Sequence, residues 1–141
     1  MRYSVVAVGR IRNAALRTAC DEYLDRLGHY TKIEEREVKD EARPSETIAG
    51  ATRLVALSRV GEPWSSPELA QHTARWDQEG REVAFAIGGA DGLPREVVER
   101  AEAVWSLSAL TFPHELARVL VLEQLYRAFT IRRGEPYHRG G

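Results

Sequence analysis

The last residues of the chain bring three reactive side chains together. Pro136 is followed by Tyr137, His138 and Arg139, a phenol, an imidazole and a guanidinium in consecutive positions. A chain terminus is ordinarily frayed and chemically plain. Here the imidazole suits proton transfer and the guanidinium suits contact with a phosphate or a base. Composition alone leaves two interpretations open: an inert tail, or a segment that moves a proton beside an anionic ligand.

Two further polar segments follow apolar runs. The first is IGGADGLP, with glycines at 88, 89 and 92, and the second is LSALTFPH, from Leu107 to His114. The glycine spacing matches neither the GxGxxG fingerprint nor a Walker motif. A glycine pair after a buried strand allows close approach of a ligand, or simply a tight turn. No GxSxG elbow surrounds Ser106 or Ser108, so a hydrolase is not indicated.

The histidines and the single cysteine do not predict a metal site. The four histidines have no ligand-like spacing with one another or with Cys20; they are His29, His72, His114 and His138. A lone cysteine excludes an intrachain disulfide and suits a reducing compartment. No segment has the length of a transmembrane helix or the pattern of a signal peptide. We therefore expect a soluble cytoplasmic protein without a metal and without a membrane partner.

Strand and helix patterns alternate along the whole chain. Short apolar runs predict strands over 4–8, 33–38, 53–58, 83–87 and 105–110, with the charged run 33–38 at a sheet edge. Helical spacing predicts helices over 14–28, 44–51, 94–104 and 115–131. Another helix is expected from Pro67, with Ser66 as its N-cap, to a stop at Gly80.

This alternation predicts one α/β domain over residues 1–141, with a mainly parallel sheet and helices on both faces. Ligands of such sheets bind beyond the carboxyl ends of the strands. That rule selects the loops after Leu57, at Gly88-Gly89 and at LSALTFPH. The last helix is apolar on more than one face, which favours packing on the sheet and on a second subunit; burial by its own loops is the alternative.

The net charge of the chain is only weak evidence about its binding partners. The net charge is −1, whereas general nucleic-acid binders are usually basic overall. Two separate basic segments of the sequence weaken this argument against nucleic-acid binding. One holds Arg2, Arg10, Arg12 and Arg17, and the other holds Arg127, Arg132, Arg133 and Arg139.

Several segments together resemble one protein family. VVAVGRIR, DEYLDRL, VAFAIGGADGL, WSLSALTFPHELARVLVLEQLYRAF and the closing PYHR are similar to the ribosomal RNA large subunit methyltransferase H family, over the whole chain. The resemblance implies a SPOUT-class enzyme that uses S-adenosyl-L-methionine to methylate N3 of a pseudouridine in helix 69 of 23S ribosomal RNA. It also implies a homodimer acting on the ribosome, and a trefoil knot with its cofactor site within about 53–131.

The resemblance also implies roles for particular residues. Cofactor contacts are carried over to Leu57, Gly88, Leu107, Ser108, Ala109, Leu110, Thr111 and Phe112. Within the tail, 132–141, the expected base is His138, with Tyr137 orienting or stacking and Arg139 on the RNA. Two departures from the family pattern are Ser58, in place of an expected Asp, and a shortened region between Glu37 and Arg53.

Two alternatives remain beside this expectation. One is a SPOUT methyltransferase that acts on another RNA nucleotide. The other is a non-catalytic ribosome-associated or nucleotide-binding module of the same fold, which the complete PYHR sequence disfavours. Binding of S-adenosyl-L-methionine separates the methyltransferases from the module.

Overall fold

Nine elements alternate along the chain in the computed structural model, which describes residues 2–39 and 52–140. They are β1 (Arg2–Val8), α1 (Ala14–Leu27), β2 (Lys32–Val38), β3 (Arg53–Glu62), α2 (Ser66–Glu79), β4 (Val83–Ile87), α3 (Arg95–Arg100), β5 (Ala103–Trp105) and α4 (His114–Arg132). The strands form one sheet in the order β2-β1-β4-β3-β5, and every pairing is parallel. The predicted parallel sheet with β2 at its edge is confirmed.

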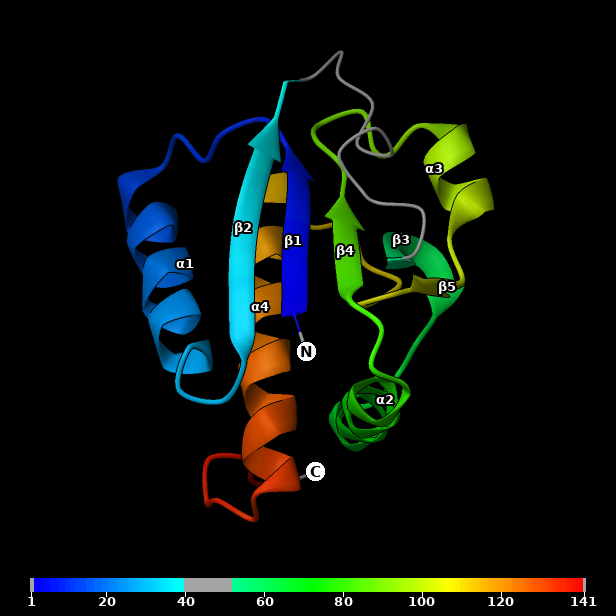
Figure 1. The fold of residues 1–141 in the computed structure, drawn as a ribbon. Helices are drawn as coiled ribbons and strands as arrows, with labels where there is room; N and C mark the ends of the chain where they lie inside the picture. Colours follow the sequence, from blue (N-terminus) through cyan, green and yellow to red (C-terminus); the bar gives the residue numbers. More distant parts are fainter. Residues whose placement is uncertain (1, 40–51, 141) are drawn as a thin grey trace.

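Helices cover both faces of this sheet (Figure 1). On one face α4 lies between α1 and α2, and on the other lies the short α3. The alternation of side chains along the strands explains the two layers. Tyr3 and Phe85 belong to the large cluster beneath α1, α2 and α4, whereas Ala84 and Ala86 pack with Val97 of α3. Helices on both faces were predicted, and the structure confirms them.

Aromatic packing joins α2 to the sheet. Trp76 and Trp105 are buried, and the partly buried Trp64 stacks on Trp105 with ring centroids 5.6 Å apart. Phe85 contacts both buried tryptophans edge-on. Each such buried aromatic pair adds about 0.5–1.5 kcal/mol beyond the burial of its area. The tryptophans therefore act as core anchors.

Some predicted boundaries were wrong. The N-cap of α2 is Ser65 rather than Ser66, because Ser65 and Glu68 form a reciprocal capping box. Helix α3 ends at Arg100 instead of continuing to 104, and β5 covers Ala103–Trp105. Residues 106–113 form a loop where the last strand was expected. The helix predicted over 44–51 lies outside the described residues.

Helix α4 is buried largely by its own chain. It packs on the sheet and against both α1 and α2, with Val121, Leu122 and Leu125 fully or almost fully buried. Its apolar surface on more than one side is thereby explained without a second subunit. Among the described helices, none is long and apolar enough to cross a membrane.

Candidate functional site

The main cavity lies at the carboxyl edge of the sheet. Its volume is about 390 Å³, within the range of ligand pockets. Strand β3, the loops after β4 and β5, helix α3 and the first turn of α4 build it. Its lining is Leu57, Ser58, Arg59, Ile87, Gly88, Gly89, Gly92, Leu93, Val98, Leu107, Ser108, Leu110, Thr111, Phe112, His114 and Ala117. The three segments that the strand rule selected from the sequence therefore meet at one site, but the first of them, expected as a loop after Leu57, is part of β3, which continues to Glu62.

Hydroxyl groups shape the loop at 106–112 from within. The Ser106 hydroxyl is buried and lies 3.0 Å from the carbonyl oxygens of both Arg59 and Ser108. The Ser108 hydroxyl accepts a hydrogen bond of 3.0 Å from the Leu110 amide. The Ser106 amide donates to the Glu62 carbonyl at 2.8 Å. These hydroxyls are therefore part of the loop's scaffold, as expected for a ligand cradle made of backbone.

Close backbone packing explains the glycine at position 88. A Cβ on Gly88 would lie 2.4 Å from the carbonyl carbon of Gly92 and 2.6 Å from the Leu93 nitrogen, so no side chain fits there. Gly92 has φ of +80° and donates its amide to the Gly89 carbonyl at 3.0 Å. The glycine segment is thus a tight turn and also a wall of the cavity. The two interpretations of this segment are compatible.

Seven of the eight residues predicted to bind a cofactor line the main cavity. Ala109 is the exception, because it is exposed and does not line it. The prediction missed Leu93 and Val98, which reach the cavity from the segment leading into α3 and from α3 itself. It also missed His114 and Ala117 of α4. A signal was available for the latter two, since His114 ends LSALTFPH and Ala117 lies in the helical turn that directly follows it.

The tail residue Tyr137 is anchored to α4. Its hydroxyl donates to a Glu123 carboxylate oxygen at 2.7 Å, and the Arg127 guanidinium lies 4.8 Å from the ring centroid. Burial raises the pKa of Tyr137 above its ordinary value, and hydrogen bonds with Tyr23 and Glu123 add to the shift. Tyr137 is therefore a protonated hydrogen-bond donor at neutral pH and not a base in this conformation.

The imidazole of His138 is held by the same helix. Its Nδ1 lies 3.1 Å from a guanidinium nitrogen of Arg127. Because a guanidinium has only donors, Nδ1 accepts, and the ring is the neutral tautomer with its proton on Nε2. Nε2 is buried and has no hydrogen-bond partner within the described residues. Arg139 is exposed and donates only to the Pro136 carbonyl, at 3.2 Å.

The tail and the main cavity lie near opposite ends of α4. Figure 1 shows the tail at the C-terminal end of this helix. The cavity contacts α4 near Ala117, whereas the tail contacts α4 near Arg127. Ten residues of α-helix separate these positions by about 15 Å. The structure therefore does not bring His138, Tyr137 and Arg139 together with the predicted cofactor residues within one chain.

Metal chemistry has no obvious location in the described part of the chain. No group of three or more His, Cys, Asp or Glu side chains is arranged to hold an ion there. Cys20 is buried, and burial raises the pKa of its thiol to about 11. The thiol is therefore not a nucleophile at neutral pH.

An all-parallel sheet with a cavity at its carboxyl edge defines an α/β ligand-binding domain. Solved structures share this fold. A probable methylase family protein from Haemophilus influenzae matches with a TM-score of 0.64 at 12% identity, covering 99% of this chain and 70% of that one. A probable methyltransferase from Bordetella pertussis matches with a TM-score of 0.62 at 15% identity, covering 91% and 96%.

Sequence comparison is more specific. The family described as "Predicted SPOUT methyltransferase" matches residues 1–138. Proteins named ribosomal RNA large subunit methyltransferase H from Anaeromyxobacter sp. and Sorangium cellulosum are 44% and 46% identical, covering 99% and 97% of this chain and 100% and 99% of their own length. The chain belongs to the SPOUT methyltransferases, in the ribosomal RNA large subunit methyltransferase H family.

Proposed function

We propose that the protein transfers a methyl group from S-adenosyl-L-methionine to N3 of a pseudouridine in helix 69 of 23S ribosomal RNA. One observation carries this proposal: the main cavity is lined by seven of the eight residues to which the family resemblance assigns cofactor contacts. The near full-length match to relatives named for ribosomal RNA methylation supports the substrate class.

The residues of the main cavity fit the methyl donor. Leu57, Leu107 and Phe112 offer apolar surface for an adenine ring. The wall at Gly88 admits no Cβ, so the backbone there approaches the ligand directly. The turns at 88–92 and 106–112 are fixed by hydrogen bonds, so their amides and carbonyls are preorganised. Leu57, Gly88 and the loop from Leu107 to Phe112 would hold the donor, with Ala109 as part of that loop.

The donor supplies an activated methyl group on sulfur, and the acceptor nitrogen must approach in line with the C–S bond. The C–S bond breaks as the N–C bond forms, and the proton on N3 leaves to a base. Holding the two reactants in line accounts for up to about 7–11 kcal/mol of the barrier in favourable cases. We assign the base role to His138, orientation to Tyr137 and RNA contact to Arg139.

A single chain cannot complete this site, so the proposal includes a homodimer in which the tail acts on the cavity of the other subunit. The separation of about 15 Å along α4 supports that arrangement. Val60 and Leu110 support it as well. Their side chains are 79% and 70% exposed, although both are large and apolar, and both lie in segments that border the main cavity.

For His138 to accept a proton, its Nδ1 must leave Arg127 or its tautomer must change, because Nε2 carries the hydrogen in the present arrangement. We infer that binding of RNA or of the second subunit moves the tail away from Arg127. The unpaired Nε2–H supports this inference, since a buried donor without a partner destabilises the present arrangement.

The proposal also includes the family's trefoil knot, within about 53–131. The family resemblance is what supports it, and within that range the neighbouring strands β3 and β5 lie tightly together. A Cβ on Gly61 would lie 2.5 Å from the Val104 carbonyl oxygen, and the Ser106 amide bonds Glu62 at 2.8 Å. We place the activity in the cytoplasm, where ribosomes are methylated.

Calorimetry with S-adenosyl-L-methionine and mass spectrometry of 23S ribosomal RNA test the proposal together. We expect binding by the purified protein, and the loss of one methyl from one pseudouridine in cells that lack the gene. A lost methyl on another nucleotide would favour the other SPOUT activity. Absence of cofactor binding would leave the non-catalytic module as the remaining candidate.

A further inference from the structure

A second cavity opens beside the main one. It has a volume of about 450 Å³, and Gly89, Gly92 and His114 line both cavities. Two of these three residues have no side chain, so the shared wall is thin. Because of that wall, a ligand in the second cavity would lie next to a ligand in the main one.

Two arginines face this cavity without partners. Arg10 and Arg12 belong to its lining and are exposed. Neither guanidinium forms an ion pair or a hydrogen bond with the residues that the structure describes. Arg17 and Arg118, nearby, are both paired with carboxylates. The charges of Arg10 and Arg12 are therefore available to a ligand.

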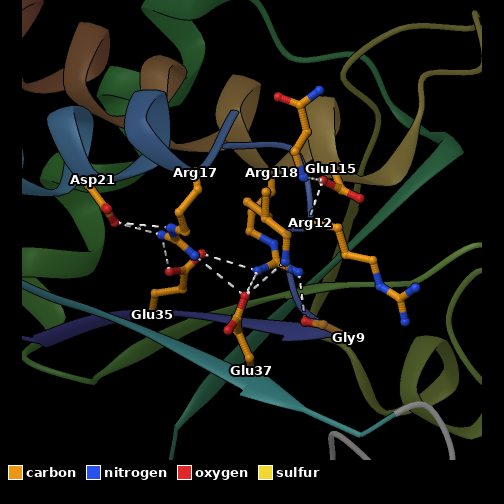
Figure 2. Close-up of polar contacts among 10 residues, drawn as sticks. Gly9, Arg12, Arg17, Asp21, Glu35, Glu37, Glu115 and Arg118 are labelled. Atoms are coloured by element: carbon orange, nitrogen blue, oxygen red, sulfur yellow. Dashed lines mark hydrogen bonds and ion pairs between the residues drawn. The ribbon is translucent and has the colours of Figure 1, made fainter. Parts of the chain in front are cut away.

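The backbone that carries these arginines is held firmly, although residues 10–13 belong to no helix or strand. The amides of Arg12 and Asn13 both donate to Glu115 Oε1 at 3.0 Å. The Gly9 carbonyl accepts a bond of 3.0 Å from Arg118 (Figure 2). Glu115 and Arg118, both on α4, thus position the loop that bears Arg10 and Arg12.

Arg118 is held in turn by the edge strand. Its side chain is 1% exposed and pairs with Glu37 and, at 3.3 Å, with Glu35. Arg17 pairs with the same two carboxylates. Asp21 pairs with Arg17 as well, so three carboxylates face the two cations. Figure 2 shows the Arg12 side chain extending away from this cluster. The cluster is a scaffold for the loop and adds no positive charge to the cavity.

The carboxylates of the second cavity indicate what kind of ligand it binds. Asp91 lines the cavity opposite the loop, and Glu115 is already engaged by two amides. A bare anion would be repelled by Asp91, whereas a nucleotide carries both a phosphate for guanidinium groups and N–H donors for a carboxylate. A polar cavity of this size that adjoins the methyl-donor site suits such a ligand.

We propose that the second cavity binds the acceptor nucleotide of the RNA, with Arg10 and Arg12 on phosphate oxygens and Asp91 accepting an N–H of the base. This inference rests on the proposed methyltransferase function. It adds the surface on which the target nucleotide lies and the residues that recognise it. Glu115 and Arg118 are positioning residues, because they act only through the loop.

The test compares two double variants of equal charge. Arg10→Gln/Arg12→Gln removes both contacts. Arg2→Gln/Arg75→Gln is the control, because both of its arginines are exposed and neither lines a cavity. The probe is the ribosome purified from cells that lack the gene, and the readouts are its binding affinity, kcat and KM for methylation, and affinity for S-adenosyl-L-methionine.

We expect the Arg10/Arg12 variant to lose about tenfold or more in ribosome affinity, because charge-assisted hydrogen bonds are lost. The slope of log affinity against log salt should fall by about 1.4 if two phosphate contacts to single-stranded RNA disappear. Cofactor affinity should stay as in the wild type. Ribosome affinity equal to that of the control variant would overturn the proposal.

Asp91→Asn tests the base contact separately. We expect a lower kcat with unchanged cofactor affinity, because the neutral amide oxygen of Asn accepts an N–H more weakly than a carboxylate does. An unchanged kcat would remove Asp91 from the proposal. Failure of the methyltransferase function itself would be recognised differently: the wild type would then bind no S-adenosyl-L-methionine or methylate no ribosomes, while the two arginine pairs still differ in ribosome binding.

Discussion

The two ends of α4 carry chemistry of different kinds. At its N-terminal end the main cavity is built from apolar side chains and from two turns whose backbone is fixed by hydrogen bonds. At its C-terminal end the tail presents two reactive side chains, Tyr137 and His138, which are held by Glu123 and Arg127. The lining of the first site comes from one chain. The second site has reactive groups but no cavity of its own among those described. Its function therefore depends on the RNA or the second subunit that it contacts.

The two ends also differ in how their charges are used. The Arg118 cluster buries its charges and fixes a loop, leaving Arg10 and Arg12 exposed. At the other end, Arg127 of α4 holds the tail. Its guanidinium occupies Nδ1 of His138, the nitrogen that would accept a proton. One end is therefore preorganised, whereas the other must rearrange before it can act. Five experiments can break or sharpen this contrast.

The largest effect is expected in the tail. His138→Ala should lower kcat for methylation by about a hundredfold or more, because a positioned base contributes 10²–10⁴-fold. Affinity for S-adenosyl-L-methionine should not change, since His138 is assigned to the proton of the acceptor nitrogen and not to the methyl donor. His29→Ala is the matched control, because His29 is exposed in the turn after α1. Unchanged turnover in His138→Ala would remove the base assignment.

Mixing two inactive variants shows which chain supplies the tail. Thr111→Trp fills the main cavity from its exposed rim and should abolish cofactor binding, which calorimetry verifies. Mixed with His138→Ala, it should restore about a quarter of wild-type activity, because half of the randomly exchanged dimers contain one intact site. If the tail acted on its own chain, the mixture would remain inactive.

The scaffold of the cavity end should show the next largest effect. Arg118→Met leaves Glu37 and Glu35 with Arg17 alone, and loss of a buried ionic partner costs about 3 kcal/mol of unfolding free energy. Arg127→Met, on α4 beside the tail, should cost less, about 1 kcal/mol, because the Arg127 side chain is 24% exposed and Tyr137 keeps its hydrogen bond to Glu123. Urea unfolding measures both. Equal costs would contradict the contrast between a buried scaffold and a movable tail.

Gly88→Ala tests the backbone character of the cavity. The new Cβ would meet the backbone of Gly92 and Leu93, so we expect about 1–3 kcal/mol of strain. Part of this strain should appear as weaker binding of S-adenosyl-L-methionine in calorimetry. Gly89→Ala is the control for folding stability, because its Cβ would first meet Val8 at an ordinary 3.4 Å. Similar thermal midpoints for the two variants would contradict the close-packing argument.

Local patterns predicted the fold better than they predicted element ends. β1 and β4 are short apolar runs closed by glycine, and such runs indicate buried strands. Adjacent serines obscured the start of α2, although Glu68, three residues after Ser65, marks the capping box. Ala103 and Val104, predicted as helix, are strand because they pair with Val55 and Ala56 of β3, a contact distant in sequence.

The candidate site was predicted only in part, because some of its contacts join residues that are distant in sequence. Parallel strands bring their carboxyl ends to one edge, so the three segments of the main cavity follow from the fold class. The second cavity depends on Arg118 reaching Gly9 and Glu37, residues 109 and 81 positions away, which no local pattern reveals. The separation of the tail from the main cavity could have been predicted from the sequence, since the predicted helix of 17 residues between them spans about 25 Å.

The smallest effect concerns the Glu115 contact that fixes the loop of Arg10 and Arg12. Hydrogen bonds from the Asn13 and Arg12 amides hold the pKa of Glu115 below its usual 4.5. A carboxylate with a depressed folded-state pKa stabilises the fold above its unfolded value, and this contribution is lost as pH falls through the folded value. Protection of the Arg12 and Asn13 amides from hydrogen exchange should therefore persist at pH 4.5 and disappear at lower pH. Protection of the Gly92 amide, bonded to a carbonyl that does not titrate, should remain. Glu115→Ala should remove the protection of Arg12 and Asn13 at every pH, and equal protection in wild type and variant would show that Glu115 does not fasten the loop.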